Sequence, residues 1–127
     1  MYQSLGKYHK AEEYQKKALA ITKEIGDRQG EASCYGSLGT VYLCLGDYGK
    51  TEEYQNKALV IQKEIVDRPG EAASYGILGS LYHSLGEYDK AEEYLKKALK
   101  IGKEIGDRNK EATNCGNLGT TYYSLGK

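Results

Sequence analysis

The segment from Gly30 to Arg68 decides the fold, and it reads GEASCYGSLGTVYLCLGDYGKTEEYQNKALVIQKEIVDR. A shift of about 40 residues places it on Gly70 to Arg108, GEAASYGILGSLYHSLGEYDKAEEYLKKALKIGKEIGDR, and more than half of the paired residues are identical. Self-similarity at a period of roughly 20–50 residues is the signature of a repeat protein. The same frame matches YQSLGKYHKAEEYQKKALAITKEIGDR near the beginning and KEATNCGNLGTTYYSLGK at the end, so the repeat covers the chain.

Two helical patterns follow each other within each repeat. Apolar residues recur every three or four positions in both, which is the period of one helix face. The first pattern runs near Glu31 to Leu45 and the second near Tyr48 to Ile65. The apolar stripe of the first is Tyr35, Leu38, Tyr42 and Leu45, and that of the second is Tyr54, Ala58, Ile61 and Ile65. The sequence therefore predicts an all-α protein made of helix pairs.

Glycine and aspartate mark the predicted helix ends. Gly46 and Gly86 follow the last apolar residue of a first helix, where a left-handed residue is needed to end it. Asp27, Asp67 and Asp107 precede the first helices, where a carboxylate can accept the free backbone N–H groups of the first turn. The order is thus helix, tight turn, helix, tight turn.

The repeated positions resemble the signature of the tetratricopeptide repeat. They are Leu38, Gly39, Tyr42, Gly46, Tyr48 and Ala58 in one repeat, and Leu78, Gly79, Tyr82, Gly86, Tyr88, Ala91 and Ala98 in the next. The length of the unit is similar to the 40-residue variety found in Pins/LGN adaptors and in large animal proteins that join such repeats to a CHAT domain. The resemblance implies a right-handed superhelical solenoid of antiparallel helix pairs. Two positions depart from the family pattern. Thr51 stands where Ala11 and Ala91 stand in the other repeats, which should loosen the contact of the second helix with Gly39. Gln15 and Gln55 stand where an aromatic residue is usual, and Leu95 replaces them in the third repeat.

We expect a single array over residues 1–127. It divides into a partial repeat at 1–30, repeats at 31–70 and 71–110, and a partial repeat with only its first helix at 111–127. Tyr2, Leu5 and Gly6 would then be the tail of an incomplete first helix. Solenoid ends without capping helices leave apolar surface uncovered, so a head-to-tail homo-oligomer is a further expectation.

The resemblance implies that the first helices line a concave groove that binds a peptide segment of a partner protein. Very few of the residues on this face can carry a charge, so a clamp for a terminal carboxylate is not expected. An extended peptide or an apolar helix suits such a groove. The alternative function is a structural spacer, or a self-assembling element with an empty groove. The predicted groove residues are Ser33, Gly36, Ser37, Thr40, Leu43, Cys44, Ala73, Gly76, Ile77, Ser80, His83, Ser84, Thr113, Gly116, Asn117, Thr120, Tyr123 and Ser124.

Gly36, Gly76 and Gly116 recur inside predicted helices, although a mid-helix glycine costs about 1 kcal/mol relative to alanine. The interpretation that we favour is that these glycines let neighbouring first helices approach closely. The alternative is that they open the groove floor for the backbone of a ligand.

The sequence gives little support for chemistry. The glutamate pairs beginning at Glu12, Glu52 and Glu92 diverge around a helix, and their second members face a lysine four residues on, as on a solvated surface. Neither a metal nor a cofactor is expected, and we predict that the chain is not an enzyme. With 18 basic and 18 acidic residues, no net charge attracts nucleic acid or a membrane surface. Cys34, Cys44 and Cys115 have no metal-ligand spacing, so free thiols and a cytoplasmic location are expected.

Overall fold

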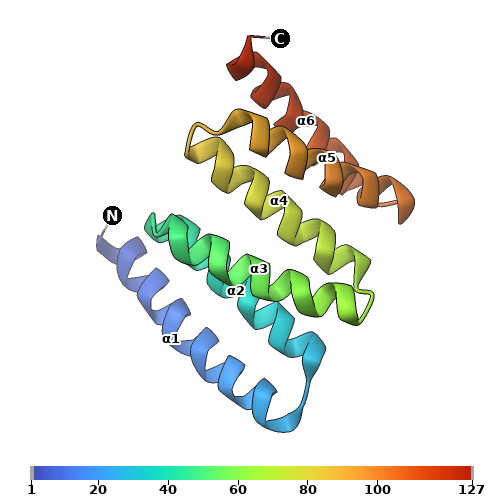
Figure 1. Cartoon of the computed structure of the whole chain (residues 1–127). Helices are drawn as coiled ribbons and strands as arrows, with labels where there is room; N and C mark the ends of the chain where they lie inside the picture. The colour runs from blue at the N-terminus through green and yellow to red at the C-terminus, as the bar shows by residue number, and fades with distance from the viewer. Residues whose placement is uncertain (1, 127) are drawn as a thin grey trace. The chain divides into compact units, whose positions relative to one another are not determined.

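A computed structural model describes residues 2–126, with side chains from residue 5 onward, and this part of the chain is all-α (Figure 1). No helix in the described part is both long and apolar enough to cross a membrane. The helices are α1 (Tyr2–Ile25), α2 (Arg28–Leu45), α3 (Tyr48–Glu64), α4 (Arg68–Ser84), α5 (Tyr88–Glu104) and α6 (Arg108–Leu125).

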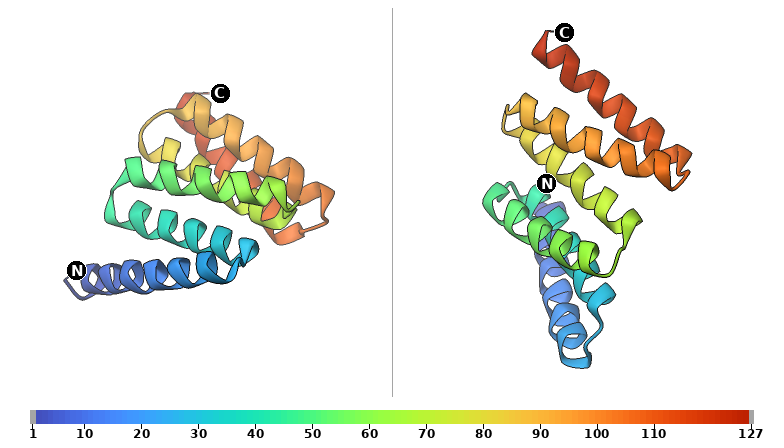
Figure 2. Two further views of the ribbon diagram at one scale, coloured as in Figure 1. Left: turned by 60° about the horizontal axis from the view of Figure 1, so that its bottom comes forward. Right: turned by 45° about the vertical axis from the view of Figure 1, so that its right-hand side comes forward.

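The helices form two units of three. The first contains α1 to α3 and ends at Val66, and the second begins at Asp67 and contains α4 to α6. In the first unit α2 packs against both α1 and α3, whereas in the second unit α5 packs against both α4 and α6 (Figure 2). In the frame of the repeat, α2, α4 and α6 are the first helices, and α3 and α5 are the second helices.

The predicted caps are confirmed. The Asp27 carboxylate accepts the Gly30 N–H at 2.9 Å, and Asp67 and Asp107 make the equivalent bonds at the start of α4 and α6. Gly46 and Gly86 both lie in the left-handed region, with φ of 79° and 76°. The cap at Asp27 makes α2 begin at Arg28, three residues before the predicted start near Glu31, because the Asp27 carboxylate satisfies the Gly30 N–H of the first turn.

The expectation for the first residues is wrong. Gly6 ends no helix: it lies within α1, which runs without a break from Tyr2 to Ile25, and it lacks the positive φ of Gly46 and Gly86. Without the left-handed turn that ends α2 at Gly46, the backbone continues as one helix through this position.

The core of the first unit lies between its helices. Ala32 and Tyr35 of α2 are buried with Ala58 and Ile61 of α3, and Leu19 of α1 packs against this cluster. Tyr54 also covers the cluster and stacks on Tyr42. The apolar stripes predicted from the sequence are therefore packed, except at Ile65, which follows the end of α3 and is 38% exposed.

The tyrosines at one repeat position do more than pack. The Tyr42 hydroxyl donates to the Glu12 carboxylate at 2.5 Å, and the Tyr122 hydroxyl donates to the Glu92 carboxylate at 2.9 Å. The first bond holds the pKa of Glu12 below its ordinary value. Burial, with the same bond, raises the pKa of Tyr42. Because Tyr42 is on α2 and Glu12 is on α1, the bond joins the two helices.

Candidate functional site

The predicted groove residues all lie on the first helices, and none of them is fully buried. In the second unit they divide between α4 and α6. Ser80, Ser84, Asn117 and Thr120 are exposed, and His83 is partly buried. Tyr123 is the most open of the set, with 87% of its surface exposed. These side chains are therefore available to a ligand.

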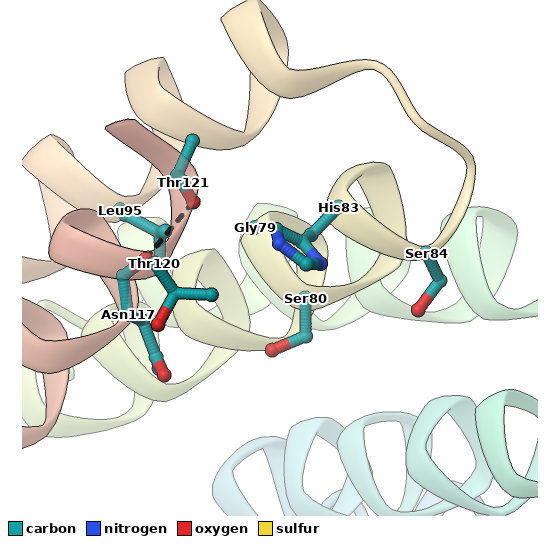
Figure 3. A pocket seen from close by; sticks show the side chains of 8 residues that line it. All are labelled: Gly79, Ser80, His83, Ser84, Leu95, Asn117, Thr120 and Thr121. Atoms are coloured by element: carbon teal, nitrogen blue, oxygen red, sulfur yellow. Dashed lines mark hydrogen bonds between the residues drawn. The ribbon is translucent and has the colours of Figure 1, made fainter. Parts of the chain in front are cut away.

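Five of the predicted residues come together around one pocket in the second unit. Ser80, His83 and Ser84 of α4 face Asn117 and Thr120 of α6 across it (Figure 3). Leu95 of α5 lines the pocket as well, with Gly79 and Thr121, and the pocket volume is about 190 Å³. The remaining predicted residues of α4 and α6 do not line it: Ala73, Gly76, Ile77, Thr113, Gly116, Tyr123 and Ser124.

Helix packing against α5 positions the two walls. A Cβ atom on Gly79 would lie 2.8 Å from Leu95 Cδ2, so only glycine lets α4 lie this close to α5. The His83 ring packs edge-on against Tyr88, the first residue of α5, with ring centroids 5.1 Å apart. Both contacts hold α4 to α5, and Leu95 is only 2% exposed beneath them.

The polar groups that line the pocket are mostly hydroxyls with free lone pairs, and one ring nitrogen of His83 is buried. His83 Nε2 is buried and has no hydrogen-bond partner within the described residues. The Thr120 hydroxyl donates to the Gly116 carbonyl at 3.2 Å, which leaves its oxygen lone pairs free to accept. Thr121 donates in the same way to the Asn117 carbonyl, as the dashed line in Figure 3 shows. The pocket thus offers mainly neutral donors and acceptors.

The recurring helical glycines do not serve close packing in the second unit. A Cβ on Gly116 would meet nothing within 4 Å, and one on Gly76 would reach only Asn114 Oδ1 at 4.0 Å. The interpretation that these glycines let α4 and α6 approach closely is therefore wrong, since no atom is near enough to require glycine. An open face for a ligand stays as the alternative prediction for Gly76 and Gly116.

The glutamates, histidines and cysteines that could support catalysis or metal binding are paired with other residues or lie apart from one another. The predicted lysine partners of the glutamates are confirmed for Glu13, Glu53 and Glu93, which lie 3.4, 4.0 and 3.6 Å from Lys17, Lys57 and Lys97. No group of three His, Cys, Asp or Glu side chains is placed to hold a metal ion in the described part. The cysteines are free, with Cys34 buried and Cys44 and Cys115 exposed.

Sequence reasoning missed the parts of the pocket that do not lie on the exposed face. Gly79 and Thr121 are buried positions of the first helices, and Leu95 belongs to a second helix. One signal was present, because Leu95 differs from the glutamines at its repeat position. That difference did not by itself indicate a pocket.

Solved structures with the same fold are found in several organisms. BtubC (BKLC) from P. vanneervenii matches with 26% identity and a TM-score of 0.85, over 95% of this chain and 51% of that one. PH0952 from Pyrococcus horikoshii, a signal transduction ATPase with numerous domains and a tetratricopeptide repeat sensor, matches with 28% identity and a TM-score of 0.84, over 91% of this chain and 18% of that one. The chain thus spans about half of the first relative and about a fifth of the second.

A protein from Podosopora anserina with nearly identical tetratricopeptide-like repeats has the same fold at 19% identity, with a TM-score of 0.79 over 98% of this chain and 62% of that one. Among curated proteins, no sequence matches this chain. The family model of the tetratricopeptide repeat matches residues 1–64, 38–104 and 70–127. Together these matches cover the whole sequence, and the chain belongs to the tetratricopeptide repeat family.

Proposed function

We propose that this chain is a scaffold that binds a peptide segment of a partner protein along the groove that the first helices form in this family. Tetratricopeptide repeats generally mediate protein–protein interactions. The observation that carries the proposal is the pocket of the second unit, where five residues of the predicted groove face one another from α4 and α6. The free cysteines of the chain suit a reducing compartment, and we propose that the protein is cytoplasmic.

The chemistry of the face favours an uncharged segment of the partner. Apart from His83, none of the residues that line the pocket can carry a charge. A carboxylate would lose its water there without gaining a lysine or arginine partner, which is costly. An extended peptide can instead use its backbone and neutral side chains against the hydroxyls of Ser80, Ser84 and Thr120.

Peptide display against the chain, run beside a Ser80→Arg variant, tests this function. Arginine at position 80 fills the pocket mouth and adds a charge, so peptides selected on the parent chain should lose binding to the variant. Asn56→Arg is the matched control, because Asn56 is exposed on α3 and the change adds the same charge away from the first helices. A motif that binds the parent and the control but not the Ser80→Arg variant supports the proposal. The absence of any selected motif contradicts it.

One observation favours a second function, in which copies of the chain stack end to end. Ile21 of α1 is 56% exposed, whereas Ile61 and Ile101 at the same repeat position are each 3% exposed because a first helix covers them. Tyr14, Ile25 and Leu5 of α1 are exposed as well. Ile21 and Tyr14 stand at the repeat positions of Ile61 and Tyr54, which pack against α2, so α6 of another copy is the occupant that we propose.

Sedimentation velocity over a range of concentrations tests the stacking. The parent chain should form species larger than a monomer, and Ile21→Lys should shift the equilibrium towards monomer. Val60→Lys is the control, since Val60 is exposed on α3. A parent chain that stays monomeric at all concentrations contradicts the stacking and leaves peptide binding as the proposed function.

A further inference from the structure

We propose that the pocket between α4 and α6 is an anchor site for a side-chain carboxamide, and that a glutamine of the bound peptide fills it. This inference rests on the proposed peptide-binding function and specifies what the groove selects. It draws on four features of the pocket: its size, its polar atoms, its lack of fixed charge and its apolar floor.

The size suits one side chain. The volume of about 190 Å³ is far larger than the roughly 15 Å³ that a single water needs. It is smaller than the roughly 300–1,000 Å³ of sites that hold drug-sized molecules or cofactors. The exposed residues Ser80 and Thr120 at the rim leave it open to solvent, so a side chain can enter from a peptide that lies on the first helices.

The polar atoms call for a group that both donates and accepts. The hydroxyls of Ser80 and Ser84 and the amide of Asn117 line the pocket, and these groups can both donate and accept. A carboxamide has an oxygen and an NH₂ group, so it can pair with them in either sense. Its NH₂ group can also donate to the Thr120 oxygen, whose own hydrogen is used by the Gly116 carbonyl.

The absence of fixed charge separates a carboxamide from its charged analogues. The lining of the pocket contains no lysine, arginine, aspartate or glutamate. A glutamate has the same shape as a glutamine, but the residues that line the pocket offer it no cation other than His83, which is charged only when protonated. A lysine would likewise find no carboxylate. The neutral amide keeps its hydrogen bonds without this desolvation cost.

The floor favours glutamine over shorter polar side chains. Leu95 and Gly79 present an apolar surface, on which the two methylene groups of glutamine can pack. The first unit contains an internal precedent. There Gln55 occupies the repeat position of Leu95, and its amide lies against Gly39 and donates to the Gly36 carbonyl at 2.9 Å. A carboxamide therefore already fits beside the equivalent glycine and first helix of this repeat.

The test is a selection of ten-residue peptides by display, followed by fluorescence anisotropy with synthetic versions of the best binder. The selected peptides should share one glutamine. Its replacement by glutamate or leucine should weaken binding about tenfold or more, since glutamate carries a charge that the lining does not pair and leucine offers the polar lining no hydrogen bond. Binding of the glutamine peptide to the Thr120→Val variant should fall about fivefold.

Thr22→Val is the matched control. Thr22 lies on α1, which is not one of the first helices; its hydroxyl also donates to a backbone carbonyl, that of Leu19 at 2.9 Å, and it does not line the pocket. Equal losses for the two variants would overturn the assignment of the site. If the selected peptides share an anchor residue other than glutamine, the carboxamide is the wrong ligand group for the pocket, and the proposal of peptide binding still holds. If no peptide is selected, both the anchor site and the proposed function fail.

Discussion

In the α2–α3 pair, Tyr54 stacks on Tyr42 with ring centroids 5.4 Å apart, and in the α4–α5 pair Tyr94 stacks on Tyr82 at the same distance. A lysine lies over the second tyrosine in both pairs: Lys57 Nζ is 5.0 Å from the centre of the Tyr54 ring, and Lys97 Nζ is 5.1 Å from that of Tyr94. The aromatic side of the two pairs is thus nearly identical.

The two pairs differ beneath the glycine where the helices come closest. In the first, Gln55 is 1% exposed and joins α3 to α2 through its bond to Gly36. In the second, Leu95 occupies the position, makes only apolar contacts with α4 and lines the pocket. The two helix pairs otherwise pack alike. Leucine in place of glutamine at this repeat position therefore removes a hydrogen bond between the helices and provides the apolar floor of the pocket.

The largest expected effect comes from truncating this floor. Leu95→Ala should lower the free energy of unfolding by about 3 kcal/mol, because it removes a buried side chain and leaves a cavity. Gln55→Ala should cost about half as much, since the loss of its packing is partly offset by relief from burying an amide. Urea denaturation of both variants measures the difference. Leu85→Ala, at a position 45% exposed, is the control for the leucine change and should cost little. If Leu95→Ala lowers the free energy of unfolding by less than Gln55→Ala does, the apolar floor is not the stronger contact between the helices.

The next largest effect is expected at Gly79, which packs against Leu95. Gly79→Ala should cost about 2 kcal/mol, because the added methyl group would lie 2.8 Å from Leu95, which is buried and cannot move aside. Gly119 has the same repeat position on α6, where a Cβ would meet nothing within 4 Å. Gly119→Ala should therefore stabilise the protein by about 1 kcal/mol through helix propensity. Thermal and urea unfolding of the pair should give opposite signs, and equal signs would show that helix approach does not decide the residue at this position.

A smaller effect tests the link between α1 and α2. Tyr42→Phe should cost about 1 kcal/mol at pH 7, because Glu12 loses its hydrogen bond to the Tyr42 hydroxyl. The bond lowers the pKa of Glu12 from its ordinary 4.5, so its contribution is fully present above that pH and is lost as the pH falls through the lower folded pKa.

Urea midpoints between pH 7 and pH 3 should show the cost of Tyr42→Phe shrinking as the pH falls. Glu12→Gln should also show a weaker dependence on pH, since it no longer titrates. Tyr14→Phe is the control, because the Tyr14 side chain is 64% exposed. A cost of Tyr42→Phe that does not change with pH would mean that the hydroxyl acts through packing alone.

The fold followed from the sequence because its signals are local and repeated. Asp27 and Gly46 mark helix ends by the backbone chemistry of a single turn, and the stripe through Tyr35 and Leu38 repeats at each unit. The pocket depends instead on contacts between separate helices. The close approach of Leu95 to Gly79 and the unpaired Nε2 of His83 require distances that periodicity does not contain. The exposed face could thus be predicted, while the pocket between α4 and α6 could not.

The smallest effect concerns the turn that ends α3. Val66 has φ of 55°, whereas glycine occupies the equivalent positions 26 and 106 with φ of 74° and 73°. A β-branched residue is strained in this region, so Val66→Gly should stabilise the protein by about 0.5 kcal/mol after allowance for the extra freedom of glycine in the unfolded chain. Gly106→Val should destabilise it by a similar or larger amount. Calorimetric melting of the two variants measures the pair. Because Val66 is 73% exposed, lost packing should contribute little, and a lower melting temperature for Val66→Gly would mean that unfolded-state freedom outweighs the strain.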